Sequence, residues 1–262
     1  MPFHFSLVDG VILGTGNLAG LLDMAKNPEK HSSESEFLGI IHGEARDFTG
    51  NKTYDDLFEN PKVKKIKTNI QNKSNYQMPQ RKRVRSEYDG DFNQDNKYDI
   101  KPFDSSFKKM VDRKIMNLEI EMSFPGFVKP EDIERFGELV MGVISDLETK
   151  GYLVQVFITE HTVGATACGK AMLSKYEIKK PNQYLNQQDI ARVLNANFYR
   201  RIFLALIRLG CEKTKFEVAH GLGKAKKFDT AVEITPEKIR FNSFTNKRAD
   251  EMLKEIYAEI NK

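Results

Sequence analysis

The chain has few of the features that mark secreted, membrane-spanning or disulfide-rich proteins. Among its 262 residues only two are cysteines, Cys168 and Cys211, too few for a disulfide framework or a four-cysteine zinc site. No segment approaches the roughly 18 consecutive apolar residues of a membrane span. The first residues lack the basic and apolar regions of a secretory signal. These absences favour a soluble protein of a reducing compartment, without a membrane partner.

The chain also lacks the common catalytic and metal-binding motifs. Its five histidines are far apart and form no HExxH pair, and no GxSxG elbow, kinase set or paired-carboxylate signature is present. Residues 14–20 and 221–224 resemble phosphate loops, but the first has the wrong glycine spacing and the second lacks its first glycine and the hydroxyl residue after Lys224. We therefore expect flexible turn glycines at 14–20, no cofactor and no metal.

The net charge of +4 hides an uneven distribution. One segment, residues 62–85, carries nine basic residues and no acidic residue among its 24 residues. The rest of the chain has 32 basic and 37 acidic residues, which gives it a net charge of −5. We call residues 62–85 the basic segment. Its charges are Lys62, Lys64, Lys65, Lys67, Lys73, Arg81, Lys82, Arg83 and Arg85.

The basic segment is rich in Asn, Gln and Ser and poor in aliphatic residues, so it cannot bury enough surface to fold alone. Three interpretations remain open. It is a solvated linker, a strip that binds nucleic-acid phosphates, or an arm that becomes ordered on an acidic protein surface. The composition divides the chain into an N-terminal α+β extension (1–60), a basic and polar arm or linker (61–105) and an α/β core domain (106–262).

The apolar pattern of the core domain predicts an α/β fold. A strand at 115–122, an amphipathic helix at 130–150 and a nearly continuous apolar strand at 152–159 form a βαβ unit, which belongs in a covered mixed sheet of von Willebrand A-like or Rossmann-like type. Further elements are predicted along the chain. They are a helix at 18–25 ended by Asn27-Pro28, strands at 170–179, 215–219, 230–234 and 238–244, a helix at 186–209 ended by Gly210, and a helix at 246–260.

Two groups of polar residues in the core domain are candidates for a binding or catalytic site. Arg200 and Arg201 lie inside the long predicted helix, and at least one is expected at its rim, where it could hold a phosphate or carboxylate or form an internal salt bridge. Glu160, His161 and Cys168 could meet in a pocket, because a nucleophilic cysteine needs a base within hydrogen-bond reach. The alternative for Cys168 is a small packed residue.

Two blocks of the sequence resemble an uncharacterised family of phage and plasmid proteins. The first runs from Asp132 to Leu139 and on from Leu147 to Val156, with a family Arg-Gly pair that Phe136 splits here. The second block is the segment from Asn197 to Phe203. The resemblance covers roughly residues 86 to 210 and supplies no catalytic residues, because the family has no established activity.

The order strand, helix, strand with an edge strand after it also resembles a von Willebrand A-type domain. That resemblance implies a divalent-metal loop, Asp-x-Ser-x-Ser, after the first strand. The segment from Glu121 to Pro125 at this place has one serine and lacks the pattern. A degenerate site of this kind implies a plain interaction surface rather than metal-mediated adhesion.

The leading hypothesis is a non-enzymatic binding protein of a phage or other mobile element, contacting nucleic acid or an acidic partner through the basic segment, with Arg200 and Arg201 as further contacts. The first alternative is a structural or assembly component of a virion, which would form homo-oligomers. The second is an enzyme with a pocket near Glu160, His161 and Cys168. Each hypothesis places the protein in the cytoplasm of the host cell or in the virion.

Overall fold

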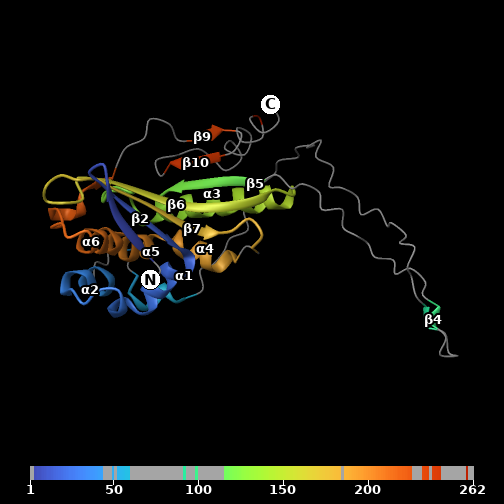
Figure 1. The fold of residues 1–262 in the computed structure, drawn as a ribbon, viewed down its shortest axis with the longest axis horizontal. Coiled ribbons are helices and arrows are strands. Elements are labelled where there is room, and N and C mark those ends of the chain that lie inside the picture. The colour runs from blue at the N-terminus through green and yellow to red at the C-terminus, as the bar shows by residue number, and fades with distance from the viewer. Residues whose placement is uncertain are drawn as a thin grey trace.

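A mixed sheet with a layer of helices packed on one face forms the body of the molecule (Figure 1). The computed structural model describes residues 3–43, 49, 52–59, 91–92, 98–99, 115–183, 186–225, 232–235, 238–242 and 258. The basic segment and nearly all of the predicted helix at 246–260 lie outside the described residues.

The strands of the main sheet are β1 (His4–Val8), β2 (Val11–Asn17), β5 (Ile115–Glu121), β6 (Leu153–Val163), β7 (Met172–Lys179), β8 (Lys224–Ala225), β9 (Val232–Thr235) and β10 (Lys238–Asn242). Their order is β1-β2-β7-β6-β5-β10-β9, with β8 paired to the end of β6. β5 is parallel to β6 and β10, and β2 is parallel to β7. The remaining neighbours are antiparallel. β3 (Asp91–Phe92) and β4 (Tyr98–Asp99) form a separate pair.

The helices are α1 (Leu18–Lys26), α2 (Ser35–His42), α3 (Pro130–Thr149), α4 (Gln187–Val193), α5 (Ala196–Phe198) and α6 (Leu204–Lys213), with the π-helix η3 (Tyr199–Phe203) between α5 and α6. Short 3-10 turns are η1 (Pro28–Lys30), η2 (Asp55–Leu57) and η4 (His220–Leu222). The prediction of a mixed α/β fold with a βαβ unit is confirmed, because α3 connects the parallel neighbours β5 and β6.

One hydrophobic core joins the N-terminal 60 residues to the later part of the chain. Phe3, Leu21, Phe37 and Leu57 are buried in the same cluster as the helix and strand residues that follow residue 115. β2 pairs directly with β7, so the N-terminal hairpin extends the sheet. We call the helix-covered side of the sheet the core face and the opposite side the second face.

The glycines of residues 14–20 do not form a turn, contrary to the sequence prediction. Gly14 and Gly16 lie inside β2, and Asn17 caps α1 by accepting a hydrogen bond from the Gly20 amide at 2.9 Å. A Cβ on Gly16 would lie 2.6 Å from the Phe3 ring, and one on Gly14 would lie 2.7 Å from the Ser174 Oγ. Glycine is therefore required here because side chains of neighbouring strands pack over the backbone of β2.

The predicted helix at 186–209 is interrupted, and its end was predicted wrongly. α4 stops at Val193, and Asn195 starts α5 by accepting a hydrogen bond from the Asn197 amide at 2.8 Å. The helix then runs past Gly210 to Lys213. Gly210 is a packing position rather than a cap, because a Cβ there would lie 2.7 Å from the Met172 Cε.

The predicted strand at 215–219 is also wrong. Lys215 has a left-handed backbone with φ of 60°, which ends α6, and only an isolated bridge joins Val218 to Thr166. The other predicted elements on described residues are present, including α1 with Asn27 as its C-cap and β7 over most of 170–179.

Candidate functional site

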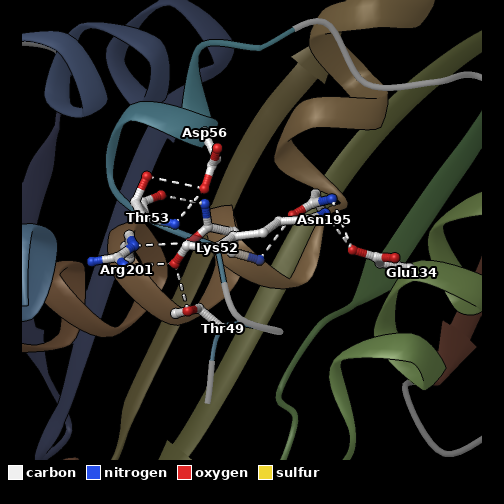
Figure 2. A network of polar contacts seen from close by, with 8 residues as sticks. Thr49, Lys52, Thr53, Asp56, Glu134, Asn195 and Arg201 are labelled. Carbon is white, nitrogen blue, oxygen red and sulfur yellow. Dashed lines mark hydrogen bonds and ion pairs between the residues drawn. The ribbon is translucent and has the colours of Figure 1, made fainter. Parts of the chain in front are cut away.

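The segment that leads into the basic segment is fixed to the body by a polar network (Figure 2). Lys52 Nζ lies 2.6 Å from Glu134 Oε1 of α3. The backbone oxygen of Lys52 accepts a hydrogen bond from Thr49 Oγ1 at 2.8 Å. The Asn197 side-chain Nδ2 donates to the Thr53 oxygen at 2.9 Å, and the Tyr54 hydroxyl donates to a carbonyl of α1 at 2.6 Å. Residues 52–59 are thus an anchored root.

Arg201 is the centre of this network. Its side chain is 2% exposed. The guanidinium donates to Asn197 Oδ1 at 2.8 Å, to the Ile41 and Gly43 oxygens at 2.7 Å each, and to the Lys52 oxygen at 3.1 Å. These bonds connect the π-helix to the end of α2 and to the root. Burial lowers the pKa of the guanidinium, although the nearby Asp56 carboxylate opposes this change.

Arg200 connects the π-helix to a different segment of the chain. Its Nη2 donates to the Pro125 oxygen at 3.1 Å and to the Val128 oxygen at 3.0 Å, both in the loop between β5 and α3. The Tyr199 hydroxyl supports the same loop by accepting from the Phe124 amide at 2.9 Å. Burial lowers the pKa of the Arg200 guanidinium.

Both arginines are therefore buried and donate to backbone oxygens, so neither reaches the rim of a helix as the sequence predicted for at least one of them. The sequence prediction did not foresee the burial of both arginines, because it treated residues 186–209 as a regular α-helix. A π-helix such as η3 changes the directions of consecutive side chains and frequently occurs at functional positions. Whether either arginine also contacts a partner stays a prediction.

A cluster of buried polar side chains lies where the parallel strands β5 and β6 end. Glu121 is opposite Thr159 in the register, and Thr159 Oγ1 donates to Glu121 Oε2 at 2.9 Å. The Ser123 hydroxyl donates to the other Glu121 oxygen and accepts from the His161 amide, with 2.5 Å between Ser123 Oγ and the His161 nitrogen. The carboxyl ends of parallel strands are the usual position of ligand sites in α/β proteins.

Glu160 follows Thr159 in β6, and strand alternation turns its side chain to the core face. It is 2% exposed, and its Oε2 atom has no hydrogen-bond partner among the described residues. Burial raises the pKa of this carboxyl well above its ordinary value, and the Glu121 carboxylate raises it further. The carboxyl group is therefore neutral over a wider pH range than an exposed glutamate.

Two buried tyrosines interact electrostatically with Glu160. Tyr176, two residues beyond Ser174 on β7, has its pKa raised by burial and by the Glu160 carboxyl, and the nearby Ser174 hydroxyl opposes this change. The same two causes, in the same order, raise the pKa of Tyr199. Neutral carboxyl and phenol groups cost less free energy to bury at low dielectric than charged ones, because no charge is desolvated.

The structure does not bring the side chains of Glu160 and His161 together. They are consecutive residues of β6, so they lie on opposite faces of the sheet. Cys168 is exposed in the loop after β6, where the Thr166 hydroxyl lies 3.2 Å from its sulfur and, ahead of Lys170, lowers the pKa of the thiol. Cys211 is buried in α6, and burial raises its pKa to about 11.

The described residues offer no arrangement for a metal ion. No group of three or more His, Cys, Asp and Glu side chains among them could hold one. A von Willebrand A-type domain has its metal loop at the place of Glu121 and Ser123. Here the Ser123 hydroxyl donates a hydrogen bond to the Glu121 carboxylate. This donor set does not fit such a site. Within the described part of the chain, no helix is long and apolar enough to cross a bilayer.

These features define a mixed α/β protein with a buried carboxyl cluster at the ends of β5 and β6. A second feature is the buried Arg201, which holds the anchored root on the body. The chain belongs to the family described as domain of unknown function DUF7192, which matches residues 105–262. No curated protein and no solved structure matches the chain. The matched region contains both arginines and both carboxyl groups of the cluster, whereas the basic segment lies before it.

Proposed function

We propose that this protein is a non-enzymatic binding protein that contacts a polyanion, nucleic acid in the first instance, through the basic segment. The observation that carries the proposal is the charge distribution: nine basic residues and no acid on 24 residues, in a chain whose other residues sum to −5. Lysine and arginine at this density displace counterions from phosphates without requiring a particular fold.

The anchored root supports the proposal. Arg201, Asn197 and Glu134 hold residues 52 and 53 against the body, so the root that precedes the basic segment in the chain is fixed on the α/β domain. A polyanion bound by the segment would consequently be held near the body rather than on a free tail. The body itself carries the opposite net charge and would repel the same ligand.

Charge-matched variants test which lysines and arginines bind. One variant changes Arg81, Lys82, Arg83 and Arg85 to Gln. The control changes four exposed lysines of the body, Lys180, Lys213, Lys215 and Lys224, to Gln. We expect the first variant to bind a DNA or RNA duplex at least tenfold more weakly at low salt and the control to bind within about twofold of wild type. Equal losses would contradict the proposal, since they would indicate a response to net charge alone.

An acidic protein partner is the other polyanion that the basic segment could bind. It would be identified by the absence of any binding to DNA or RNA together with salt-sensitive capture of an acidic polypeptide such as polyglutamate. The origin from a phage or plasmid is also part of the proposal. It rests on the two sequence blocks around Glu138 and Arg200 that resemble proteins of such elements.

A further inference from the structure

β1 is an edge strand of the main sheet. It stands at one end of the strand order, and β2 is its only neighbour among the described residues. The hairpin register is regular, from His4 opposite Thr15 to Val8 opposite Val11, without a bulge. An edge of this kind presents a row of backbone N–H and C=O groups to which another strand can pair.

The turn between β1 and β2 determines which backbone groups point outward. Asp9 and Gly10 have φ values of 48° and 78°, the left-handed conformations of a two-residue type I′ turn. The residues that flank such a turn exchange both backbone hydrogen bonds, and bonded and non-bonded pairs then alternate along the hairpin. His4, Ser6 and Val8 therefore bond to β2, whereas Phe5 and Leu7 direct their N–H and C=O groups to the open edge.

Within β1 itself, the residues that usually protect an edge are absent. Natural sheets protect their edges with lysine, proline, bulges or inward-pointing charges. The strand sequence His-Phe-Ser-Leu-Val has none of these. Leu7 is instead 47% exposed and Val8 46% exposed, so apolar side chains flank the open backbone groups.

We propose that the outer edge of β1 pairs with β1 of a second copy of this chain, forming a two-fold symmetric dimer with a sheet continuous across it. The strand is complementary to itself in the antiparallel direction. With Ser6 on the two-fold axis, Phe5 of each copy lies opposite Leu7 of the other. The axis therefore produces this pair twice. The two residues of each pair exchange the backbone hydrogen bonds that point outward from the edge.

The side chains suit this register. Leu7, exposed in the single chain, gains Phe5 of the second copy as an apolar neighbour. Residues 5–8 carry no charge, so no like charges meet across the axis, and His4 lies opposite Val8. Because a pair of five-residue strands is a small interface, the dimer is a weak one that forms at high protein concentration.

A disulfide trap tests the register. Ser6→Cys in a Cys168→Ser background, which removes the exposed native thiol, puts two cysteines on the axis as a non-bonded pair about 4.5 Å apart between Cα atoms, within disulfide reach. Thr15→Cys in the same background is the control, an exposed position of β2 away from the edge. We expect oxidation to give covalent dimers of the Ser6→Cys chain and to leave the Thr15→Cys chain monomeric. Equal cross-linking of the two would overturn the proposal.

Sedimentation of the full chain tests the edge without a cross-link. Leu7→Pro removes an outward N–H, and Leu7→Lys adds an edge charge, so each should raise the dimer dissociation constant by at least about tenfold. Leu173→Lys, on an exposed position of β7 in the middle of the sheet, should leave it unchanged. A dimer that persists in both Leu7 variants would overturn the proposal. If Leu7→Pro fails to fold, Leu7→Lys and the disulfide trap decide. The sedimentation samples contain no polyanion, so this result does not depend on the proposed function.

Discussion

Two carboxyl groups lie buried where β5 and β6 end, and they differ in how their oxygens are satisfied. Glu121 accepts hydrogen bonds from the Ser123 and Thr159 hydroxyls, which favour a charged carboxylate. Glu160 is the next residue after Thr159, yet its Oε2 atom has no partner among the described residues. Burial and the neighbouring Glu121 charge raise its pKa, so the neutral form persists to a higher pH than in an exposed glutamate.

The free energy of unfolding should therefore depend on pH through Glu160. Its folded-state pKa is above the ordinary value of 4.5, so its stabilising contribution is complete below that value and is lost as pH rises through the folded-state pKa. Glu160→Gln, which cannot ionise, should gain stability relative to wild type as the pH rises above 4.5, and it should flatten the pH dependence there.

Urea unfolding at several pH values measures this effect. Glu131→Gln, on the exposed start of α3, is the control and should follow the wild-type curve within about 0.5 kcal/mol. A Glu160→Gln chain with an unchanged pH dependence would mean that the Glu160 carboxyl titrates normally in the folded state.

At the scale of elements, the packing of α3 beside the end of α4 depends on the absence of a side chain at one position. A Cβ on Gly137 would lie 2.8 Å from the Leu194 carbonyl oxygen, a backbone atom that cannot turn away. Gly137→Ala should destabilise the protein by about 1–3 kcal/mol despite the higher helix propensity of alanine. The matched control is Gly39→Ala in α2, where nothing lies within 4 Å, and it should stabilise by about 0.5–1 kcal/mol. Thermal melts of the two variants that shift in the same direction would contradict this packing.

The same packing explains where sequence reasoning about the elements failed. The apolar stripe of residues 186–209 has helical spacing, but Leu194 packs on α3 at Gly137 and Asn195 starts a new helix beside it. Periodicity alone does not detect such a break. By contrast, the hairpin of β1 and β2 had a local signal, since Asp9-Gly10 between apolar residues favours a type I′ turn. The sequence prediction did not use it, and it assigned Gly14 and Gly16 to a turn.

At the scale of the whole molecule, the fold class and the βαβ unit were predictable because α3 and its two flanking strands have strong periodicity. The roles of Arg200 and Arg201 were not predictable, because both donate to carbonyl oxygens of segments far away in sequence, in residues 41–43 and 125–128. The N-terminal hairpin joins a sheet formed mostly after residue 115, another long-range pairing that no local pattern indicates.

The central claim is that a polyanion binds through the basic segment, and the salt dependence of nucleic-acid binding tests it most directly. The slope of the logarithm of affinity against the logarithm of salt concentration becomes shallower by about one unit for each phosphate that the protein no longer neutralises. For the variant with all nine basic residues of the segment changed to Gln, we predict a slope several units shallower than that of wild type. An unchanged slope, with both proteins binding the same nucleic acid, would contradict the claim.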